Sequence, residues 1–512
     1  MISFLISMLA LVLGYMIYGS IVERIFGPDD RETPAQRLAD GVDYVEMPTW
    51  RVFMIQFLNI AGTGPIFGAI MGMWFGPAAL LWIVLGCIFA GATHDYLSGM
   101  LSMRHDGASL PVLVGKYLGN ATQRVMLVFV LLLMLMVGAV FVYSPAIILT
   151  GFTGTMTLWI VIIFLYYIIA TLLPIDKIIG KVYPLFAFSL IFMAIALMVV
   201  LLVKMPSLPE LWHIGQMEQW RTSQMVGGAD ALGVVSFMQK NPLFPCLFIT
   251  IACGAISGFH ATQSPLMARC MKSERLGRKV FYGSMITEGM VALIWATVSS
   301  YFFYAGGWRD VVPADQVEAF LAQLPGPEGK TLIQYFGAPA VVKLVCTGWL
   351  GLFGGVLAIL GVVAAPITSG DTAFRSVRLI LAETFHLNQR AVSRRLMVSV
   401  PVFLCAFGLL MWQIGNPDGF NVLWQYFGWA NQTLSVFTLW TVTVYMVLKG
   451  KAYWVMLVPA IVMTVVCSTF IVVSPQALAL PAWWAWIVSP LVAIVSVIWF
   501  FVWKSHRKVT AE

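Results

Sequence analysis

FLNIAGTGPIFG, residues 57–68, interrupts an apolar run that is long enough to cross a membrane. Proline removes a backbone N–H and glycine weakens a helix interior, so we expect the helix to stop within this stretch. Backbone groups freed at membrane depth find no partner in lipid. They must therefore serve the protein or a ligand. The residues that break the run are Asn59, Gly62, Thr63, Gly64 and Pro65.

The composition indicates an all-α polytopic membrane protein. The chain has 512 residues, of which 60% are hydrophobic and 10% are charged. Its first apolar run has no basic segment before it and no small-residue cleavage site after it, so we expect a retained helix rather than a signal peptide. Apolar windows predict thirteen spans, near 2–21, 50–72, 76–102, 124–148, 156–173, 181–203, 243–265, 279–303, 339–366, 395–412, 424–447, 453–474 and 483–503.

The basic residues predict how these spans are oriented. Of the 30 Lys and Arg residues, 24 fall in alternate connections, and basic connections stay cytoplasmic. The N-terminus is therefore expected outside and the C-terminus in the cytoplasm. The net charge of +7 follows from this arrangement, so membrane lipid is the expected surroundings and no nucleic-acid partner is expected. Two long outer connections, 204–242 and 304–338, contain helix-like patches that suit surface helices or a lid.

A second interrupted span reads GAISGFHATQSP, residues 254–265. It opens five spans after the first broken span and enters from the opposite side, which is typical of an inverted-repeat transporter. The alternative is that these residues are ordinary kinks, because Gly and Pro are common in membrane helices. The expected organisation is an N-terminal helix and loop (1–49), repeat 1 (50–203), an outer connection (204–242), repeat 2 (243–447) and two C-terminal helices with a tail (448–512).

Half-helix N-termini at the two breaks would offer N–H groups to an anionic small-molecule substrate. Asn431, within FGWANQTLS, adds an amide from the tenth core helix; an alternative role for it is to hold helices together. The predicted substrate-binding residues are Asn59, Thr63, Gly64, Gly258, Phe259, His260 and Asn431.

The segment AAPITSGDTAFR, residues 364–375, places Thr368 and Ser369 at the expected inner end of the eighth core helix. Adjacent hydroxyls and carbonyls of a nearby broken helix would form an all-oxygen site for a hard monovalent cation. The alternative is that both hydroxyls bond to their own helix.

Ionisable residues at membrane depth are costly and are functional candidates by default. The candidates for proton coupling are His94, Asp95, Glu288 and Asp371, and His260 could also carry a proton. His94 and Asp95 could instead form an interhelical polar contact, and Asp371 could pair with Arg375 at the cytoplasmic end. The seven cysteines show no CxxC pairing and are expected to be packing residues.

Motifs of soluble enzymes are missing from the sequence. It contains no G-x-x-x-x-G-K-[ST] loop, no H-E-x-x-H and no G-x-S-x-G. We therefore expect neither an enzyme nor direct drive by ATP, and no cofactor.

The broken segments lie within a longer pattern. NIAGTGP, GATHDYLSGMLSMRHDGASL, SGFHA, a T-S-G-D-T-x-x-R segment and LWQYFGWANQTL occur in this order over roughly residues 50–450. The pattern resembles the carbon starvation protein A family of bacterial inner-membrane transporters. The resemblance implies uptake of peptides, and in some members pyruvate, during carbon limitation. It also implies the five-plus-five core of the amino acid/polyamine/organocation superfamily.

The resemblance also suggests a coupling ion. Superfamily members similar to the sodium-coupled leucine transporter carry an Ala-x-x-Thr-Ser pattern as a sodium site. Ala365, Thr368 and Ser369 match that pattern, with carbonyls near Ala61 to Gly64 as expected partners. Relatives that transport pyruvate are instead regarded as proton-coupled. The chain is also shorter than the best-known family members, which have further spans on the C-terminal side.

Together these features predict a secondary active importer in the bacterial inner membrane, driven by a sodium or a proton gradient, with its site between the two broken helices. Two other classes stay open: a channel, which needs a continuous polar pore, and a nutrient-responsive sensor without active accumulation. The choice between peptide and pyruvate, the driving ion, the stoichiometry and the oligomeric state do not follow from the sequence.

Overall fold

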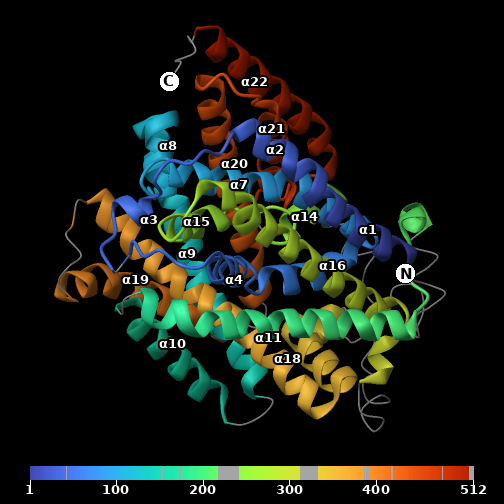
Figure 1. Ribbon diagram of the computed structural model, residues 1–512. Coiled ribbons are helices and arrows are strands. Elements are labelled where there is room, and N and C mark those ends of the chain that lie inside the picture. Colours follow the sequence, from blue (N-terminus) through green and yellow to red (C-terminus); the bar gives the residue numbers. More distant parts are fainter. Residues whose placement is uncertain are drawn as a thin grey trace.

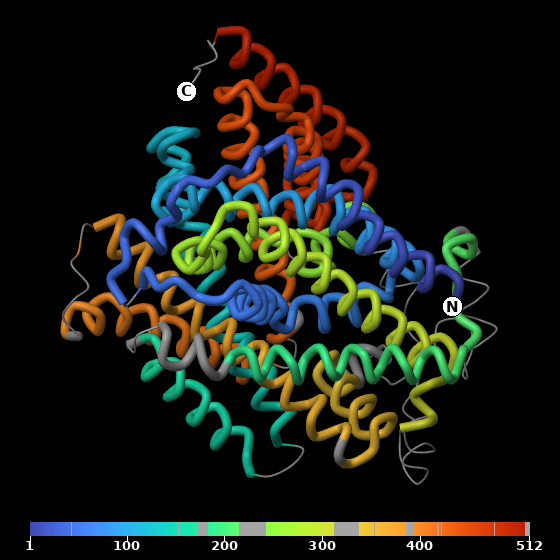
Figure 2. The backbone as a smooth tube through the Cα atoms, viewed as in Figure 1, coloured from blue at the N-terminus to red at the C-terminus, as the bar shows by residue number. Residues whose placement is uncertain are grey.

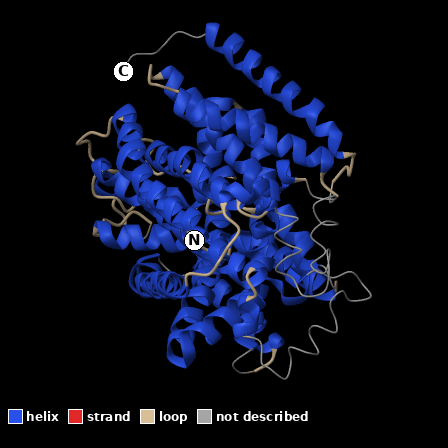
Figure 3. Ribbon diagram, turned by 90° about the vertical axis from the view of Figure 1, so that its right-hand side faces the viewer, coloured by secondary structure: helices blue, strands red, loops and turns tan. Residues whose placement is uncertain are grey.

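The computed structural model describes residues 1–506 apart from 42, 151–153, 173–174, 217–241, 312–331, 386, 388–391, 417–418 and 476. Every regular element in these described residues is helical, which confirms the expected all-α class (Figures 1 and 3). Most of both outer connections, with their helix-like patches, lies outside the described residues.

The helices form one leading span, two five-helix units and two trailing spans (Figure 1). The leading span consists of α1 (Ile2–Leu13), η1 (Gly14–Tyr18) and α2 (Gly19–Phe26). The first unit consists of α4 (Thr49–Ile60), η2 (Gly64–Gly68), α5 (Ala69–Gly72), η3 (Met73–Phe75), α6 (Ala78–Leu85), η4 (Gly86–Gly91), α7 (Ala92–Met103), α9 (Asn120–Thr150), α10 (Met156–Leu172) and α11 (Ile175–Lys204). The second unit consists of α14 (Leu243–Thr250), α15 (His260–Ala268), η7 (Arg278–Tyr282), α16 (Gly283–Tyr304), α18 (Leu332–Thr384), α19 (Val392–Gly415) and α20 (Gly419–Leu448). The trailing spans are α21 (Trp454–Val473) and α22 (Ala485–Ser505), and short helices α3 (Pro34–Arg37) and α8 (Leu110–Leu118) lie in connections.

Nine helices of the described chain are long and apolar enough to cross a membrane, and one bent pair adds a tenth. The other three expected spans fall on α10, on the pair α14 and α15, and on α20. The bent pair is Thr49–Ile60 with Gly64–Phe75, whose axes differ by 52°. The break therefore lies where FLNIAGTGPIFG predicted it.

Local chemistry explains both breaks. The first helix leaves helical geometry at Ala61, and Pro65 stands in the first turn of the next helix, where its missing N–H costs nothing. The second break runs from Ile251 to Phe259, between α14 and α15. Gly254 lies in this break with φ +89°, which residues with a side chain rarely adopt.

The two units pack against each other around α9 and α18. Helix α9 contacts α18, α19 and α20, while α11 crosses α18 and also contacts α4 (Figure 1). Helix α16 lies against α4 and the leading helix α1. The last helix, α22, contacts α21 and stands at the outer edge of the molecule (Figure 2).

The eighth core helix differs from the expectation. Positive φ angles at Gly337 and Gly351 divide α18, and its candidate membrane span runs over Gly354–Thr384 rather than 339–366. The apolar run had been assigned too early in the chain because the segment before Gly351 is also apolar. Thr368 and Ser369 therefore lie in the middle of the span and not at its inner end.

Candidate functional site

The two broken helices meet at their breaks. A Cβ atom added to Gly64 would lie 2.3 Å from the Cys253 Sγ, so only glycine allows the backbone of the first break to approach the second so closely. A Cβ added to Gly254 would in turn lie 3.8 Å from the Cα of Pro65. The site predicted between the breaks is thus a place where they are in direct contact.

The first break carries buried polar side chains that the protein leaves without partners. Asn59 and Thr63 are fully buried. Within the described residues, neither amide atom of Asn59 nor the hydroxyl of Thr63 has a hydrogen-bond partner, and the same holds for the amide of Gln56 one turn earlier. Such groups are costly to bury unless something satisfies them, so they are suited to receive a polar ligand.

One residue of α20, Asn431, accepts hydrogen bonds from three groups of the second break. The side-chain oxygen of Asn431 accepts hydrogen bonds from the Phe259 N–H at 2.7 Å and from the Ser257 hydroxyl at 3.1 Å. Its backbone carbonyl accepts from the Gly258 N–H at 3.2 Å. The amides of Gly258 and Phe259, which the sequence assigned to a substrate carboxylate, are thus bonded to Asn431 in this structure.

Four ionisable side chains from three helices form a buried chain. Asp95 of α7 lies between two histidines: its Oδ1 is 2.8 Å from His94 Nδ1 and its Oδ2 is 2.8 Å from His260 Nδ1. On the other side of the His260 ring, Nε2 lies 3.4 Å from Glu288 Oε2 of α16. All four side chains are fully buried. The structure therefore brings His260, predicted for substrate, together with three of the four predicted proton carriers.

Of the two adjacent hydroxyls of α18, on Thr368 and Ser369, only that of Ser369 contacts the first broken helix. Ser369 Oγ donates to the Asn59 carbonyl at 3.0 Å and approaches the Leu58 carbonyl at 3.3 Å. Thr368 Oγ1 bonds to its own helix, including the Ala365 carbonyl at 2.9 Å. The predicted alternative, a bond to the same helix, thus holds for Thr368, and the cation site predicted at this pair stays a prediction.

The carbonyls at Ala61 to Gly64 were predicted as cation ligands. They come shortly after the carbonyls of Leu58 and Asn59, which Ser369 contacts. A Cβ added to Gly62 would lie 3.1 Å from Ser369 Oγ, so this stretch is within van der Waals reach of the hydroxyl. The carbonyl oxygens that Ser369 contacts belong to Leu58 and Asn59 of α4, which precede the predicted carbonyls in the chain.

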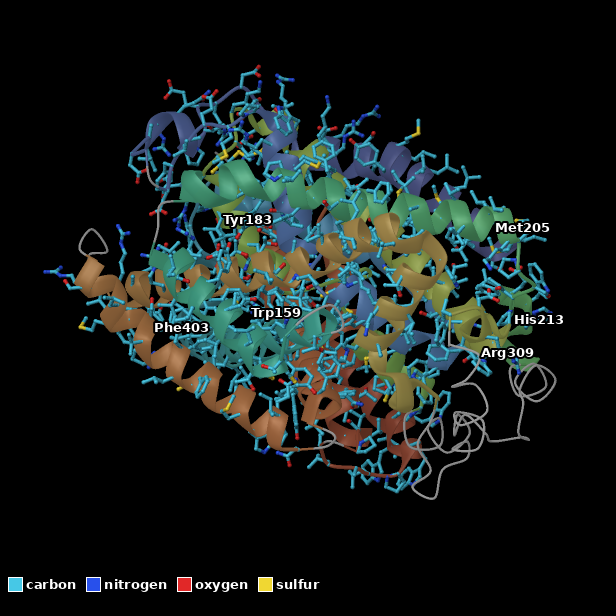
Figure 4. All side chains as sticks on the ribbon, turned by 90° about the horizontal axis from the view of Figure 1, so that it is seen from below. Trp159, Tyr183, Met205, His213, Arg309 and Phe403 are labelled. Carbon is cyan, nitrogen blue, oxygen red and sulfur yellow. The ribbon has the colours of Figure 1, made fainter. Side chains whose placement is uncertain are left out.

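The predicted ion pair between Asp371 and Arg375 is wrong. Asp371 Oδ2 instead accepts a hydrogen bond from the Tyr183 hydroxyl of α11 at 2.6 Å, and Figure 4 labels Tyr183 on that helix. The Arg375 guanidinium donates to the Ala170 carbonyl of α10 at 2.8 Å. Both side chains are buried in mid-span, where each bonds to a neighbouring helix rather than to the other.

Ion pairs connect the loops at the end of the molecule where basic residues gather. Arg104 forms two hydrogen bonds to Glu274, at 3.1 and 3.0 Å, and Arg275 forms two to Asp30, at 2.6 and 2.7 Å. Hydrogen bonds from Arg275 hold the pKa of Asp30 below its ordinary value. These contacts join the loops that follow α2, α7 and α15.

Sequence reasoning missed Cys253. It treated every cysteine as a packing residue because no spacing motif was present, yet Cys253 lies in the second break and its Sγ is within reach of both His260 and Glu288. The available signal was its position, one residue before GAISGFHATQSP. The sequence also gave no sign of a lateral groove of about 580 Å³ between α6, η4 and α21. None of the predicted site residues lines this groove.

An all-helical bundle with two broken helices in contact, and polar groups buried at the breaks, is the architecture of membrane transporters with inverted repeats. Within that class the chain belongs to the carbon starvation protein CstA family, whose model matches residues 1–149, 142–323 and 332–470. It is 44% identical to an uncharacterized membrane protein of Haemophilus influenzae, over 59% of this chain and 91% of that protein. It is 27% identical to the peptide transporter CstA of Campylobacter jejuni, over 88% of this chain and 76% of that protein. It is 26% identical to the peptide transporter CstA of Escherichia coli, over 88% and 77%.

Solved structures show the same fold at low sequence identity. A mutant of the Eremococcus coleocola manganese transporter matches with a TM-score of 0.55 at 13% identity, over 91% of this chain and 98% of that chain. MhsT in complex with L-phenylalanine matches with a TM-score of 0.50 at 12% identity, over 88% and 97%. A Na⁺-coupled sialic acid symporter also reaches 0.50 at 12% identity, over 96% of both chains. The expected five-plus-five core is confirmed.

Proposed function

We propose that this membrane transporter is a secondary active importer of small carboxylate-bearing nutrients, either short peptides or pyruvate, across the bacterial inner membrane, with its N-terminus outside. The observation that carries the proposal is the contact between the two breaks, together with the side-chain polar groups of Asn59 and Thr63, which are buried at the first break and have no partner in the described chain. The relatives named as peptide transporters support the substrate class.

The substrate carboxylate binds at the first break. The Asn59 amide and the Thr63 hydroxyl are donors without partners in the described chain, and both are fully buried. The helix that restarts at Gly64 adds the positive end of its dipole. The second break supplies the opposite wall, since Asn431 holds the Gly258 and Phe259 amides in place.

The driving ion is a cation that binds where α18 meets α4. Ser369 Oγ already contacts carbonyl oxygens of α4. The neighbouring Thr368 Oγ1 donates to the Ala365 carbonyl, one turn earlier in the same helix. A site of oxygen ligands suits a hard monovalent cation such as sodium. By linking the two helices, the bound cation would favour one state of the transporter over the other. A proton gradient is the alternative, with His94, Asp95, Glu288 and Asp371 as its predicted carriers.

Uptake of labelled pyruvate into proteoliposomes, under separately imposed sodium and proton gradients, tests the proposal. We expect saturable accumulation above the outside concentration under the sodium gradient, and competition by unlabelled dipeptides shows whether the site also accepts peptides. Accumulation under the proton gradient alone would overturn the sodium assignment. Flux that only equilibrates would favour a channel. If neither labelled pyruvate nor labelled dipeptides enter, the importer proposal fails and a sensor is favoured.

A further inference from the structure

A cluster of three metal-ligating side chains lies at the second break. Cys253 is in the break itself, His260 begins α15, and Glu288 comes from α16. One ligand atom from each residue lies within 4.8 Å of the other two. All three residues are buried. The cluster therefore joins the interrupted helix to its neighbour through three donors of different chemistry: sulfur, nitrogen and oxygen.

The orientation of the His260 ring is fixed from the far side. Its Nδ1 is 2.8 Å from Asp95 Oδ2, so the carboxylate accepts the ring proton at that nitrogen. Nε2 then points toward Glu288, and among the described residues neither Nε2 nor either oxygen of Glu288 has a hydrogen-bond partner. A carboxylate behind a histidine whose other nitrogen is free is the usual outer support of a metal-bound histidine.

Two contacts fix the position of the Cys253 sulfur. The Asn431 amide Nδ2 donates to Cys253 Sγ at 3.6 Å, and the Cys253 thiol donates to Ser257 Oγ at 3.5 Å. The same Asn431 holds the break through its oxygen, so the position of Cys253 depends on α20.

We propose that Cys253, His260 and Glu288 bind one divalent transition-metal ion of the Zn²⁺ class, with a fourth position open. Thiolate, imidazole and carboxylate together suit zinc and cobalt, whereas magnesium and calcium prefer oxygen ligands alone. The thiolate and the carboxylate neutralise the two charges of the ion, which matters because unbalanced charge inside a membrane is costly. The proposal is independent of the substrate and coupling ion assigned above.

The geometry needs only a modest contraction to form the site. In a tetrahedral zinc site with ligand distances of about 2.0–2.3 Å, neighbouring ligand atoms lie about 3.5 Å apart. The present donors are within 4.8 Å, and His260 Nε2 and Glu288 Oε2 are already 3.4 Å apart. Cys253 belongs to the irregular break rather than to a regular helix, so its approach to the other two ligands would not require a regular helix to bend.

Spectroscopy with Co²⁺ on purified full-length protein tests the site directly. The protein should carry no affinity tag and should have the Cys405→Ser change, because Cys405 is an exposed thiol. We expect one bound Co²⁺ with a thiolate-to-metal charge-transfer band, and displacement of the cobalt by Zn²⁺. Cys253→Ser should remove the band, whereas Cys246→Ser, a matched change of a buried cysteine on the preceding half-helix, should keep it. Asp95→Asn should weaken affinity about 10–100-fold without removing a ligand.

A second measurement leaves all three proposed ligands unchanged. In the Cys405→Ser protein, Zn²⁺ should slow alkylation of Cys253, read by mass spectrometry, and should leave alkylation of Cys246 unchanged. A protein that binds no Co²⁺, or binds it without the thiolate band and without protection of Cys253, would overturn the proposal. Because both readouts are made in detergent without a gradient, a failure of metal binding is distinct from a failure of transport.

Discussion

The two broken helices share a design but use it differently. The first break is short, from Ala61 to Thr63, and the side-chain polar atoms of Asn59 and Thr63 have no protein partners in the described chain. The second break is longer, from Ile251 to Phe259, and two of its N–H groups are bonded to Asn431.

Because of this difference, the proposed function gives the two breaks different roles in binding the substrate. Buried polar groups without a protein partner are costly unless a ligand satisfies them, whereas groups that are already bonded need none. Gly64 of the first break lies against Cys253 of the second. Under the proposed function, the second break would form the wall of a site whose donors come from the first. The inverted repeat is therefore symmetric in its helices and asymmetric in its chemistry.

The largest expected effect comes from the His260→Ala change at the second break. It removes the ring that separates Asp95 from Glu288, and loss of one partner from a buried ionisable pair costs about 3–5 kcal/mol. We expect folded protein in detergent with a much lower unfolding temperature and no uptake. Combining it with Asp95→Asn should recover part of the lost stability, as a double-mutant cycle would show. Normal uptake by His260→Ala would remove this ring from the transport mechanism.

The Asn431→Ala change should have the next largest effect. It strands the Phe259 N–H and the Ser257 hydroxyl, and each stranded buried group costs about 1–3 kcal/mol. The neighbouring Gln432→Ala change is the matched control, because the Gln432 amide donates to the Phe248 carbonyl at 2.9 Å and its Oε1 has no partner in the described chain. Thermal unfolding should show a clearly larger loss for Asn431→Ala. Equal losses would contradict the assignment of Asn431 to the second break.

A change at the first break should affect transport without affecting stability. Thr63→Val removes a hydroxyl that bonds to nothing in the described protein, so the unfolding temperature should stay the same or rise slightly. If the hydroxyl donates to the substrate carboxylate, KM for uptake should rise about tenfold, equivalent to about 1.4 kcal/mol. An unchanged KM would show that the first break does not bind the substrate through Thr63.

Among the changes that break a hydrogen bond within the protein, the smallest loss of stability is expected for Ser369→Ala, which removes the contacts of this hydroxyl with α4. Loss of such a neutral hydrogen bond costs about 1 kcal/mol. The control is Thr372→Ala, whose hydroxyl bonds to carbonyls of its own helix at 3.1 Å. The sodium dependence of uptake should weaken in Ser369→Ala and persist in Thr372→Ala. If both variants keep the dependence of the unaltered protein, the cation site is wrongly placed.

Much of the fold followed from the sequence because its signals are local. Glycine, proline and asparagine inside apolar runs marked both breaks, and the spacing of five spans between them predicted the inverted repeat. The predicted position of the eighth core helix was wrong because an apolar segment before Gly351 has the same composition as a span. Composition alone does not show where φ changes sign.

The site was less predictable because its contacts join distant parts of the chain. Asp95 and His260 are 165 residues apart, and no local pattern says that their helices face each other. Asn431 was recognised as an amide at membrane depth, but its bonds to the second break depend on how α20 packs. Cys253 carried no spacing motif, so only the folded arrangement shows it beside His260 and Glu288.

The central claim is that the first break receives the carboxylate of the substrate. A structure of the protein with a transported compound bound tests this most directly. The account predicts the carboxylate of that compound within hydrogen-bond distance of the Asn59 amide and the Thr63 hydroxyl, with the amides of Gly258 and Phe259 still bonded to Asn431. A compound bound elsewhere, for example in the lateral groove lined by Trp82 and Trp454, or held by the Gly258 and Phe259 amides in place of Asn431, would contradict it.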